Sequence, residues 1–320
     1  MGENNEVGSC NRDNYSRRKI MRKSIFATDA LRISITNTCN FDCIYCSNEG
    51  QQHNEGQYLN IEFIKAFCRK IKNENIYLRR VNITGGEPLL HPELFYIIHE
   101  FAQVTDNVAL NTNGSLINKN KLKNLVKYGV NTIKIGIDNI VGVEAKPCLS
   151  IQNINNPEHL KRNILLCKQY IQDTSLDVVL SSANAMTIDS VVKFVINNKL
   201  NNTLFIELIQ SDFWNNGIIP DKGLSFQELL QILIKNSNKL NYSFNSERGI
   251  YNVIINDKLH VFYTLDYCKY NLCNNLSMRV NSNGEFVSCV KENIQTPIDL
   301  CGSLINQVNN IKRDYSCRQN

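Results

Sequence analysis

Short runs of β-branched and other apolar residues alternate with helical stretches from residue 31 to about residue 209. The runs have the length and composition of buried strands. We expect six strands, at residues 31–36, 81–84, 108–112, 132–138, 176–181 and 203–209. We expect the helices between them at residues 61–73, 93–104, 118–128, 157–172 and 187–199. Gly129 directly follows the third of these helices and is placed to end it.

Six strand–helix repeats predict a curved parallel sheet wrapped in helices, an α/β fold of the partial (β/α)6 TIM-barrel type. In such folds the chemistry gathers at the carboxyl ends of the strands. The pattern changes near residue 220, where a helix around 225–240 precedes two probable hairpins. Their strands are expected at 251–256 with 259–264, about Asn256-Asp257, and at 278–281 with 285–289, about Asn283-Gly284. The expected division is a tail at 1–24, a core domain at 25–220 and an α+β extension at 221–320.

Composition narrows the function classes. Of the 320 residues, 42% are hydrophobic and 20% charged, which is typical of a soluble globular protein, and no run approaches the 18 apolar residues of a membrane span. The net charge of +5 is too mild to indicate a dedicated nucleic-acid binder. The N-terminus lacks the apolar segment of a secretory signal, so we expect a cytoplasmic protein with no membrane partner.

Twelve cysteines are the most informative feature of the composition. In a reducing compartment clustered thiols indicate metal binding rather than disulfides. One cluster consists of Cys39, Cys43 and Cys46, in a short loop after the first strand. A structural zinc site closes with four protein ligands, whereas three thiolates on a 4Fe-4S cluster leave one iron open. A zinc site would need a fourth ligand, for which His53 is the nearest candidate.

The spacing of these cysteines carries a resemblance. The run LRISITNTCNFDCIYC, with Tyr45 before the last cysteine of a Cys-x3-Cys-x2-Cys pattern, resembles the signature of the radical S-adenosylmethionine (SAM) superfamily. The second strand ends in a segment similar to that family's GGEP motif, formed by Gly85, Gly86, Glu87 and Pro88. The resemblance implies that these glycines permit close backbone approach and that Glu87 or neighbouring carbonyls accept hydrogen bonds from the methionine ammonium of SAM.

The next two strands end in segments similar to the family's TNG and SLD motifs. They are Asn111-Thr112-Asn113-Gly114 and Gly136-Ile137-Asp138. The resemblance places Thr112 and Asp138 at the SAM site, while an ordinary turn and a helix cap are the alternatives. Gly136 stands where relatives usually have serine, so a ribose contact from that side chain is absent.

The resemblance implies a specific chemistry. The open iron would chelate the amino and carboxylate groups of SAM, and one electron from the reduced cluster would cleave its C5′–S bond. The resulting 5′-deoxyadenosyl radical would abstract a hydrogen atom from the substrate, so no acid–base catalytic residue is assigned. A reductant such as flavodoxin or ferredoxin is the implied partner.

Similarity to one branch extends further along the chain. The segments TGGEPLL, LNTNGSLI, LFIELIQ and CNNLSMRVNSNGEFVSCV look like the molybdenum-cofactor GTP 3′,8-cyclase family. In that family three C-terminal cysteines bind a second 4Fe-4S cluster, and the resemblance assigns this role to Cys268, Cys273 and Cys289, as in auxiliary-cluster domains of the SPASM or twitch type. A zinc ribbon or unligated thiols remain alternatives, and Cys301 or Cys317 is a candidate fourth ligand.

This chain departs from that branch at two places. Arg279 is the single arginine where the cyclases have Asn-Arg-x-Arg, and the chain ends without their Gly-Gly. We therefore expect a radical SAM enzyme that modifies a natural-product or peptide substrate by dehydrogenation, epimerisation or bond formation. GTP 3′,8-cyclisation is the alternative enzyme function, and a zinc-binding RNA-interaction module is the alternative of another class.

Overall fold

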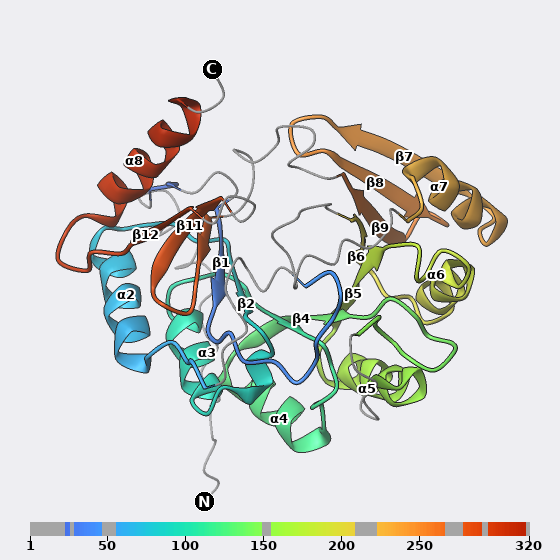
Figure 1. Cartoon of the computed structure of the whole chain (residues 1–320), viewed down its shortest axis with the longest axis horizontal. Helices are drawn as coiled ribbons and strands as arrows, with labels where there is room; N and C mark the ends of the chain where they lie inside the picture. The colour runs from blue at the N-terminus through green and yellow to red at the C-terminus, as the bar shows by residue number, and fades with distance from the viewer. Residues whose placement is uncertain are drawn as a thin grey trace, which may run out of the picture.

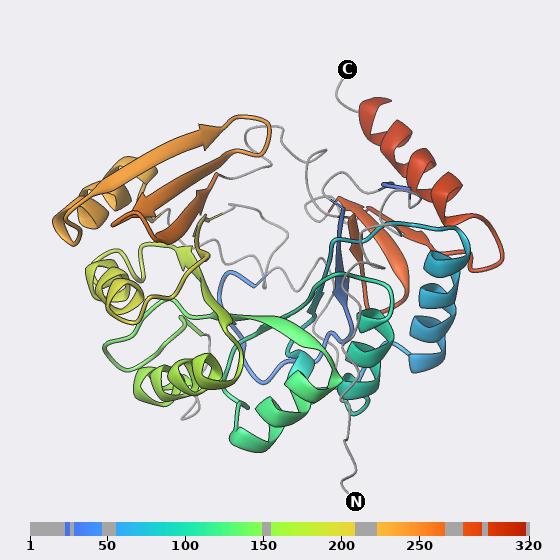
Figure 2. The same cartoon turned by 180° about the vertical axis from the view of Figure 1, so that it is seen from behind.

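The computed structural model describes residues 23–25, 29–46, 56–148, 155–208, 223–265, 278–289 and 294–317. Its strands form one 12-stranded sheet in the order β12-β11-β10-β1-β2-β3-β4-β5-β6-β9-β8-β7. The sheet curves into an arc with the helices on its outer side (Figures 1 and 2). The end strands β12 and β7 do not pair with each other, so the barrel is open. The expected partial barrel is confirmed.

The centre of the sheet consists of the six expected strands, all parallel. They are β1 (Ala30–Ser34), β2 (Arg80–Thr84), β3 (Val108–Thr112), β4 (Val130–Gly136), β5 (Asp173–Leu180) and β6 (Thr203–Glu207). The helices that connect them are α2 (Ile61–Asn73), α3 (Leu94–Ala102), α4 (Lys119–Tyr128), α5 (Pro157–Tyr170) and α6 (Ile188–Asn197). A short 3₁₀ helix, η2 (Pro88–Leu90), follows β2.

Local signals in the sequence set the ends of these helices. The Asn60 side chain accepts from the Glu62 N–H at the start of α2, and the Asn118 side chain accepts from the Lys121 N–H at the start of α4. Both contacts satisfy N–H groups that have no partner within the helix. Gly129 ends α4 with φ of 115°, a left-handed conformation that glycine adopts without strain. The prediction that Gly129 ends this helix is confirmed.

The C-terminal strands extend the same sheet at both edges. After α7 (Phe226–Lys235), the strands β7 (Leu240–Asn245), β8 (Ile250–Ile255) and β9 (Leu259–Thr264) join through β9, which pairs in parallel with β6. The strands β10 (Met278–Val280), β11 (Glu285–Cys289) and β12 (Ile294–Pro297) join through β10, which pairs in parallel with β1. Both expected hairpins are confirmed. Asn256 and Asp257 have φ of 51° and 60°, as a tight hairpin turn requires.

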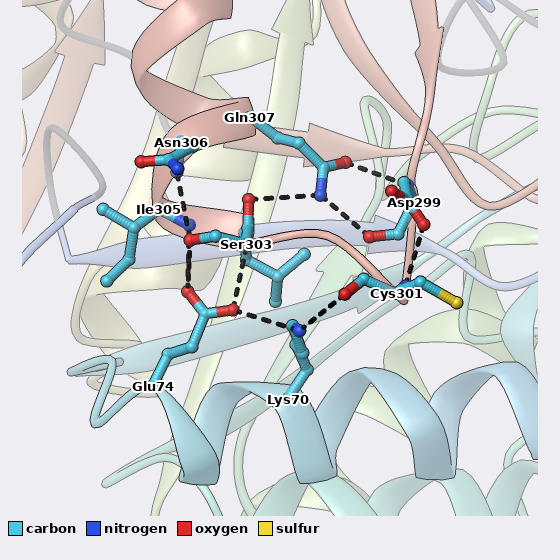
Figure 3. Close-up of polar contacts among 9 residues, drawn as sticks. Lys70, Glu74, Asp299, Cys301, Ser303, Ile305, Asn306 and Gln307 are labelled. Carbon is cyan, nitrogen blue, oxygen red and sulfur yellow. Dashed lines mark hydrogen bonds and ion pairs between the residues drawn. The ribbon is translucent and has the colours of Figure 1, made fainter.

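The last helix, α8 (Leu304–Cys317), is anchored on the end of α2. The Glu74 carboxylate accepts from the N–H groups of Leu304 and Ile305 and from the Ser303 hydroxyl, at 3.0 to 3.2 Å (Figure 3). A carboxylate at this position satisfies unpaired N–H groups and complements the positive end of the helix dipole. A long-range contact thus fixes an element that no strand or turn signal in the sequence had indicated.

The two faces of the sheet differ in character. Leu31 and Ile33 of β1 are fully buried and pack in the main core with Ile64 and Phe67 of α2. Because side chains alternate along a strand, Arg32 lies on the opposite, inner face. In the described part of the chain, no helix is both long and apolar enough to cross a membrane.

Candidate functional site

The cysteine loop lies at the carboxyl end of β1. Cys43 is buried, while Cys39 and Cys46 are partly buried, and none of the three is in a disulfide. They belong to a small apolar cluster, separate from the main core, that also contains Phe41, Tyr45 and Leu208. A tight turn in which the Cys46 N–H donates to the Cys43 carbonyl at 3.0 Å holds the last two cysteines together. Three thiols in an apolar surrounding form a donor set suited to an iron–sulfur cluster.

The environment of Cys39 and Cys43 favours the protonated form of their thiols when no iron is present. Burial, with the nearby Glu87 carboxylate, raises the pKa of the Cys39 thiol far above its ordinary value. A contact with Cys148 and burial raise the pKa of the Cys43 thiol in the same direction. Iron binding must therefore displace these protons, since the thiolate is the ligand.

The GGEP segment packs directly against the start of the cysteine loop. The N–H groups of Gly86 and Glu87 donate to the carbonyls of Thr36 and Thr38, each at 2.8 Å. A Cβ added at Gly85 would lie 2.5 Å from the Thr36 oxygen, and one at Gly86 would lie 2.2 Å from the Thr38 oxygen. Glycine is therefore required at both positions, because the two backbones approach too closely for any side chain.

Glu87 holds the second and third strand ends together. Its buried carboxylate accepts from the Thr112 hydroxyl and the Asn113 N–H, each at 2.7 Å, and from the Leu89 N–H at 2.9 Å. Burial raises the pKa of this carboxyl group, while these hydrogen bonds oppose the shift. Pro88 begins the 3₁₀ helix that Glu87 caps. Glu87 and Thr112 thus contact each other directly.

Asn113, which was not among the predicted site residues, links the third strand end to the cysteine loop. Its amide nitrogen donates to the Asn40 side-chain oxygen at 2.9 Å and lies 3.9 Å from the Cys39 sulfur. The Asn40 amide in turn donates to the Ser115 hydroxyl at 2.9 Å. In the sequence, Asn113 and Gly114 have the pattern of an ordinary turn. The local pattern therefore did not predict the contact between Asn113 and the cysteine loop.

The fourth strand end carries a buried charged network. Asp138 accepts from the Tyr45 hydroxyl and, at 2.9 Å, from the Val179 N–H, and its carboxylate lies 3.5 Å from the Lys146 ammonium. Burial raises the pKa of Asp138, with Lys146 opposing the shift. Burial also disfavours the Lys146 ammonium, but Asp138 together with the neighbouring cysteines outweighs burial and raises the pKa of Lys146. The structure therefore brings Tyr45 and Asp138 together around a lysine that the sequence had not indicated.

Gly136 makes room for that lysine. A Cβ at this position would lie 3.2 Å from the Lys146 nitrogen. In the sequence, the absence of a side chain at Gly136 indicates a lost ribose contact. In the structure, the ammonium group of Lys146, from the following loop, lies next to this position. A glycine inside a strand often marks a place where another group approaches closely, so Gly136 was the signal that the sequence offered for this contact.

Cys289, the described member of the second cysteine group, lies at the opposite end of β1 from the Cys39–Cys46 loop. The register aligns Val287 with Arg279 and Met278 with Leu31, so Cys289 lies level with the start of β1. The Cys39–Cys46 loop follows the end of that five-residue strand, roughly 15 Å away along it. Cys268 and Cys273 lie outside the described residues. Cys301 is exposed beside Lys70, and the length of α8, about 20 Å, separates its backbone from that of Cys317.

Polar side chains line the inner face of the sheet. Arg32 of β1 and Arg279 of β10 are direct neighbours in register. Further round the arc, Asp177 accepts from the Asn111 amide at 3.1 Å and lies 3.8 Å from the Lys134 ammonium. In the described part of the chain, no three His, Cys, Asp or Glu side chains converge to hold a single metal ion. The inner face suits a polar or charged substrate rather than an apolar one.

Comparison with known families gives a match to the model described as the Radical SAM superfamily over residues 33–194, half of the chain. Among curated relatives, this chain is 33% identical over 112 residues to a protein named probable GTP 3′,8-cyclase from Methanocaldococcus jannaschii, which covers 35% of this chain and 37% of the relative. It is 24% identical over 276 residues to the protein of the same name from Thermococcus kodakarensis, covering 82% and 85%. The first match spans only about a third of each protein.

Solved structures share the fold at low identity. SuiB of Streptococcus suis, bound to precursor peptide SuiA, superposes with a TM-score of 0.61 at 14% identity and covers 96% of this chain and 72% of its own. The structure titled native anSMEcpe with bound AdoMet has a TM-score of 0.60 at 16% identity and covers 89% and 82%. These likenesses describe the fold alone.

Proposed function

Since this chain belongs to the radical SAM superfamily and is an enzyme of that class, we propose that Cys39, Cys43 and Cys46 hold its 4Fe-4S cluster. A cluster bound by three thiolates supplies the electron that cleaves SAM to a 5′-deoxyadenosyl radical. The observation that carries the assignment is the arrangement of the three thiols in an apolar cluster at the carboxyl end of β1. Family membership leaves the zinc-dependent RNA-binding module without support.

The residues around the loop have a positioning role in this proposal. The backbone of Gly85 and Gly86, fixed against Thr36 and Thr38, and the neighbouring carbonyls offer acceptors for the SAM ammonium. Glu87 and Thr112 keep the second and third strand ends in register. Tyr45, Asp138 and Lys146 form a buried network that ties the loop after β4 to the cysteine loop.

We place the substrate on the inner face of the sheet. Arg32 and Arg279, on adjacent strands about 4.8 Å apart, favour an anionic group on the substrate. A natural product or a peptide with a carboxylate or phosphate meets this requirement. The SuiB structure, described as bound to a precursor peptide, supports the idea that an open sheet of this kind admits a peptide.

GTP 3′,8-cyclisation is the second candidate function. The names of the curated relatives and the retained Arg279 favour it. The single arginine, where the cyclases have a pair, tells against a site for a triphosphate. Anaerobic incubation with GTP, SAM and dithionite separates the candidates, because formation of a cyclised guanine nucleotide would identify the cyclase.

Anaerobic reconstitution with iron and sulfide tests the assignment as a whole. We expect a brown protein that converts SAM to 5′-deoxyadenosine when dithionite is added, and we expect Cys43→Ala to retain less iron and to lose 5′-deoxyadenosine formation. The matched control is Cys68→Ala, because Cys68 packs in the main core on α2. Iron retention and 5′-deoxyadenosine formation in Cys43→Ala equal to those of the control would refute the assignment.

A further inference from the structure

A fourth cysteine, Cys148, lies beside one of the proposed cluster ligands. Its sulfur is 3.7 Å from the sulfur of Cys43, although 105 residues separate them in the chain. Cys148 belongs to the loop between β4 and α5, the loop that also supplies Lys146. The spacing of the first three cysteines gives this residue no place, and it lies outside both cysteine groups identified in the sequence.

The backbone geometry brings these two residues within disulfide reach. Cys43 and Cys148 face each other in a short antiparallel bridge, and the neighbouring Ile44 N–H donates to the Pro147 carbonyl at 3.0 Å. The hydrogen bond lies beside the pair and not between its members, which makes it a non-hydrogen-bonded pair with Cα atoms about 4.5 Å apart. Disulfides span Cα separations of about 4.4–6.8 Å. The sulfurs therefore need only a small side-chain rotation to bond.

A buried asparagine holds the loop in this position. Asn155 accepts from the Lys146 N–H at 2.9 Å, donates to the Lys146 carbonyl at 2.7 Å and lies with its amide 3.3 Å from the Cys148 sulfur. The backbone carbonyl of Asn155 also accepts from the Ala145 N–H at 2.8 Å. These contacts of Asn155 hold Cys148 against Cys43. Cys148 differs in this respect from an exposed thiol such as Cys301.

We propose that Cys148 is a redox partner of Cys43, and that the two form a reversible disulfide in the cluster-free chain. The oxidant is a low-molecular-weight disulfide such as oxidised glutathione. Both cysteine thiols are oxidised to one S–S bond, the S–S bond of the oxidant breaks, and its two sulfurs leave as thiols that carry the two protons and two electrons. The bond withholds Cys43 from iron until a dithiol reduces it. The withholding of Cys43 from iron rests on the proposed function of Cys43 as a cluster ligand, whereas the formation of the disulfide does not.

Peptide mapping tests the disulfide directly. The full-length metal-free chain is treated with oxidised glutathione without oxygen, alkylated and digested with chymotrypsin without reduction. Cleavage after Phe41 and Tyr45 separates Cys43 from Cys39 and Cys46. We expect a linked pair of peptides containing Cys43 and Cys148. We also expect the wild type to lose two titratable thiols per chain on oxidation, whereas Cys148→Ser loses none. A link from Cys43 to Cys39 or Cys46, or Cys148 alkylated as completely as before oxidation, would overturn the proposal.

Iron uptake tests its consequence. After oxidation, the wild-type chain is expected to incorporate less iron and sulfide than Cys148→Ser, and dithiothreitol is expected to restore it. Cys68→Ala, oxidised in the same way, should behave as the wild type, because Cys68 packs in the main core on α2, and Cys148→Ala checks that the result does not depend on the serine hydroxyl. Equal uptake by the oxidised wild type and Cys148→Ser would refute the masking of Cys43. A linked peptide pair in a chain that never binds iron would overturn the proposed function but leave the disulfide standing.

Discussion

The ammonium of Lys146 lies 3.5 Å from the carboxylate of Asp138, and the side chains are 10% and 0% exposed. The Lys146 nitrogen also lies 5.2 Å from the centre of the Tyr45 ring, over a residue of the cysteine loop. The pair therefore ties the loop after β4 to the proposed cluster site. A buried ion pair of this kind contributes little net stability, but losing one partner leaves an uncompensated buried charge.

Replacing Lys146 by methionine tests this dependence. Lys146→Met keeps the length of the side chain and removes its charge, so Asp138 remains buried with only neutral partners. We expect a loss of about 3 kcal/mol in the free energy of unfolding. Urea denaturation of the purified variant, followed by circular dichroism, measures the change.

Lys239→Met is the matched control for this substitution. Lys239 pairs with Asp257 at 2.9 Å, but the two side chains are 60% and 58% exposed. Solvent screens such a pair, so the expected change is below about 0.5 kcal/mol. Equal destabilisation by the two substitutions would show that the Asp138 pair is not shielded from solvent.

The Glu74 contact with α8 predicts a pH dependence (Figure 3). Burial opposes the carboxylate, but hydrogen bonds from Leu304 and Ile305 outweigh it and lower the pKa of Glu74 below its ordinary value of 4.5. The contribution of a carboxylate with a lowered pKa is fully present above 4.5 and is lost as the pH falls through the lowered value. Glu74→Gln should therefore lower the stability by about 1 kcal/mol at neutral pH.

Thermal unfolding at several pH values measures the effect of Glu74→Gln. The difference from the wild type should shrink as the pH falls below 4.5. Glu62→Gln is the control, because Glu62 is exposed and pairs only across one turn with Lys65, and its Tm should stay close to that of the wild type. A constant difference between Glu74→Gln and the wild type at every pH would contradict the role assigned to the charge.

The periodic pattern of the sequence was sufficient to predict the elements that their own residues specify. The six central strands, the five helices between them and both hairpins follow from local pattern, because each is specified by its own residues and caps. The strand β7, the strand β12 and the helix α8 were not expected. The α8 start depends on Glu74, which lies 230 residues earlier than Leu304, and no local pattern records such a contact.

The site was predictable to the extent that it depends on contiguous motifs. The Cys-x3-Cys-x2-Cys and GGEP segments could be assigned to one edge of the sheet because they follow strand ends. Lys146 and Cys148 reach the same edge from a loop with no recognisable pattern, and only the folded chain brings them to Tyr45 and Cys43. Side chains that enter a site from variable loops are invisible to motif reasoning, since their positions depend on packing.

Arg32 and Arg279 are direct neighbours in register on adjacent strands, and this pairing predicts an anion-binding surface. Inorganic pyrophosphate is a suitable probe, because it carries several negative charges and no base or sugar. We expect it to raise the Tm of the wild-type chain, since a ligand that binds only the folded state stabilises it. Arg32→Ala and Arg279→Ala should each reduce the shift, and Arg248→Ala, in the turn between β7 and β8, should leave it unchanged. The same shift in all four proteins would place the anion elsewhere.

Gly86 provides the sharpest test of the packing between the GGEP segment and the cysteine loop. An alanine Cβ at this position would lie 2.2 Å from the backbone oxygen of Thr38, which has no freedom to move without shifting the loop. We expect Gly86→Ala to cost about 3 kcal/mol and to lower iron retention, because the loop that carries the three thiols is displaced. Gly136→Ala is the matched control, since its Cβ would meet the movable end of Lys146 at 3.2 Å, and we expect it to keep both stability and iron. Urea denaturation and the iron-to-protein ratio after anaerobic reconstitution measure the two properties, and full iron retention by Gly86→Ala would mean that the GGEP backbone does not position the loop.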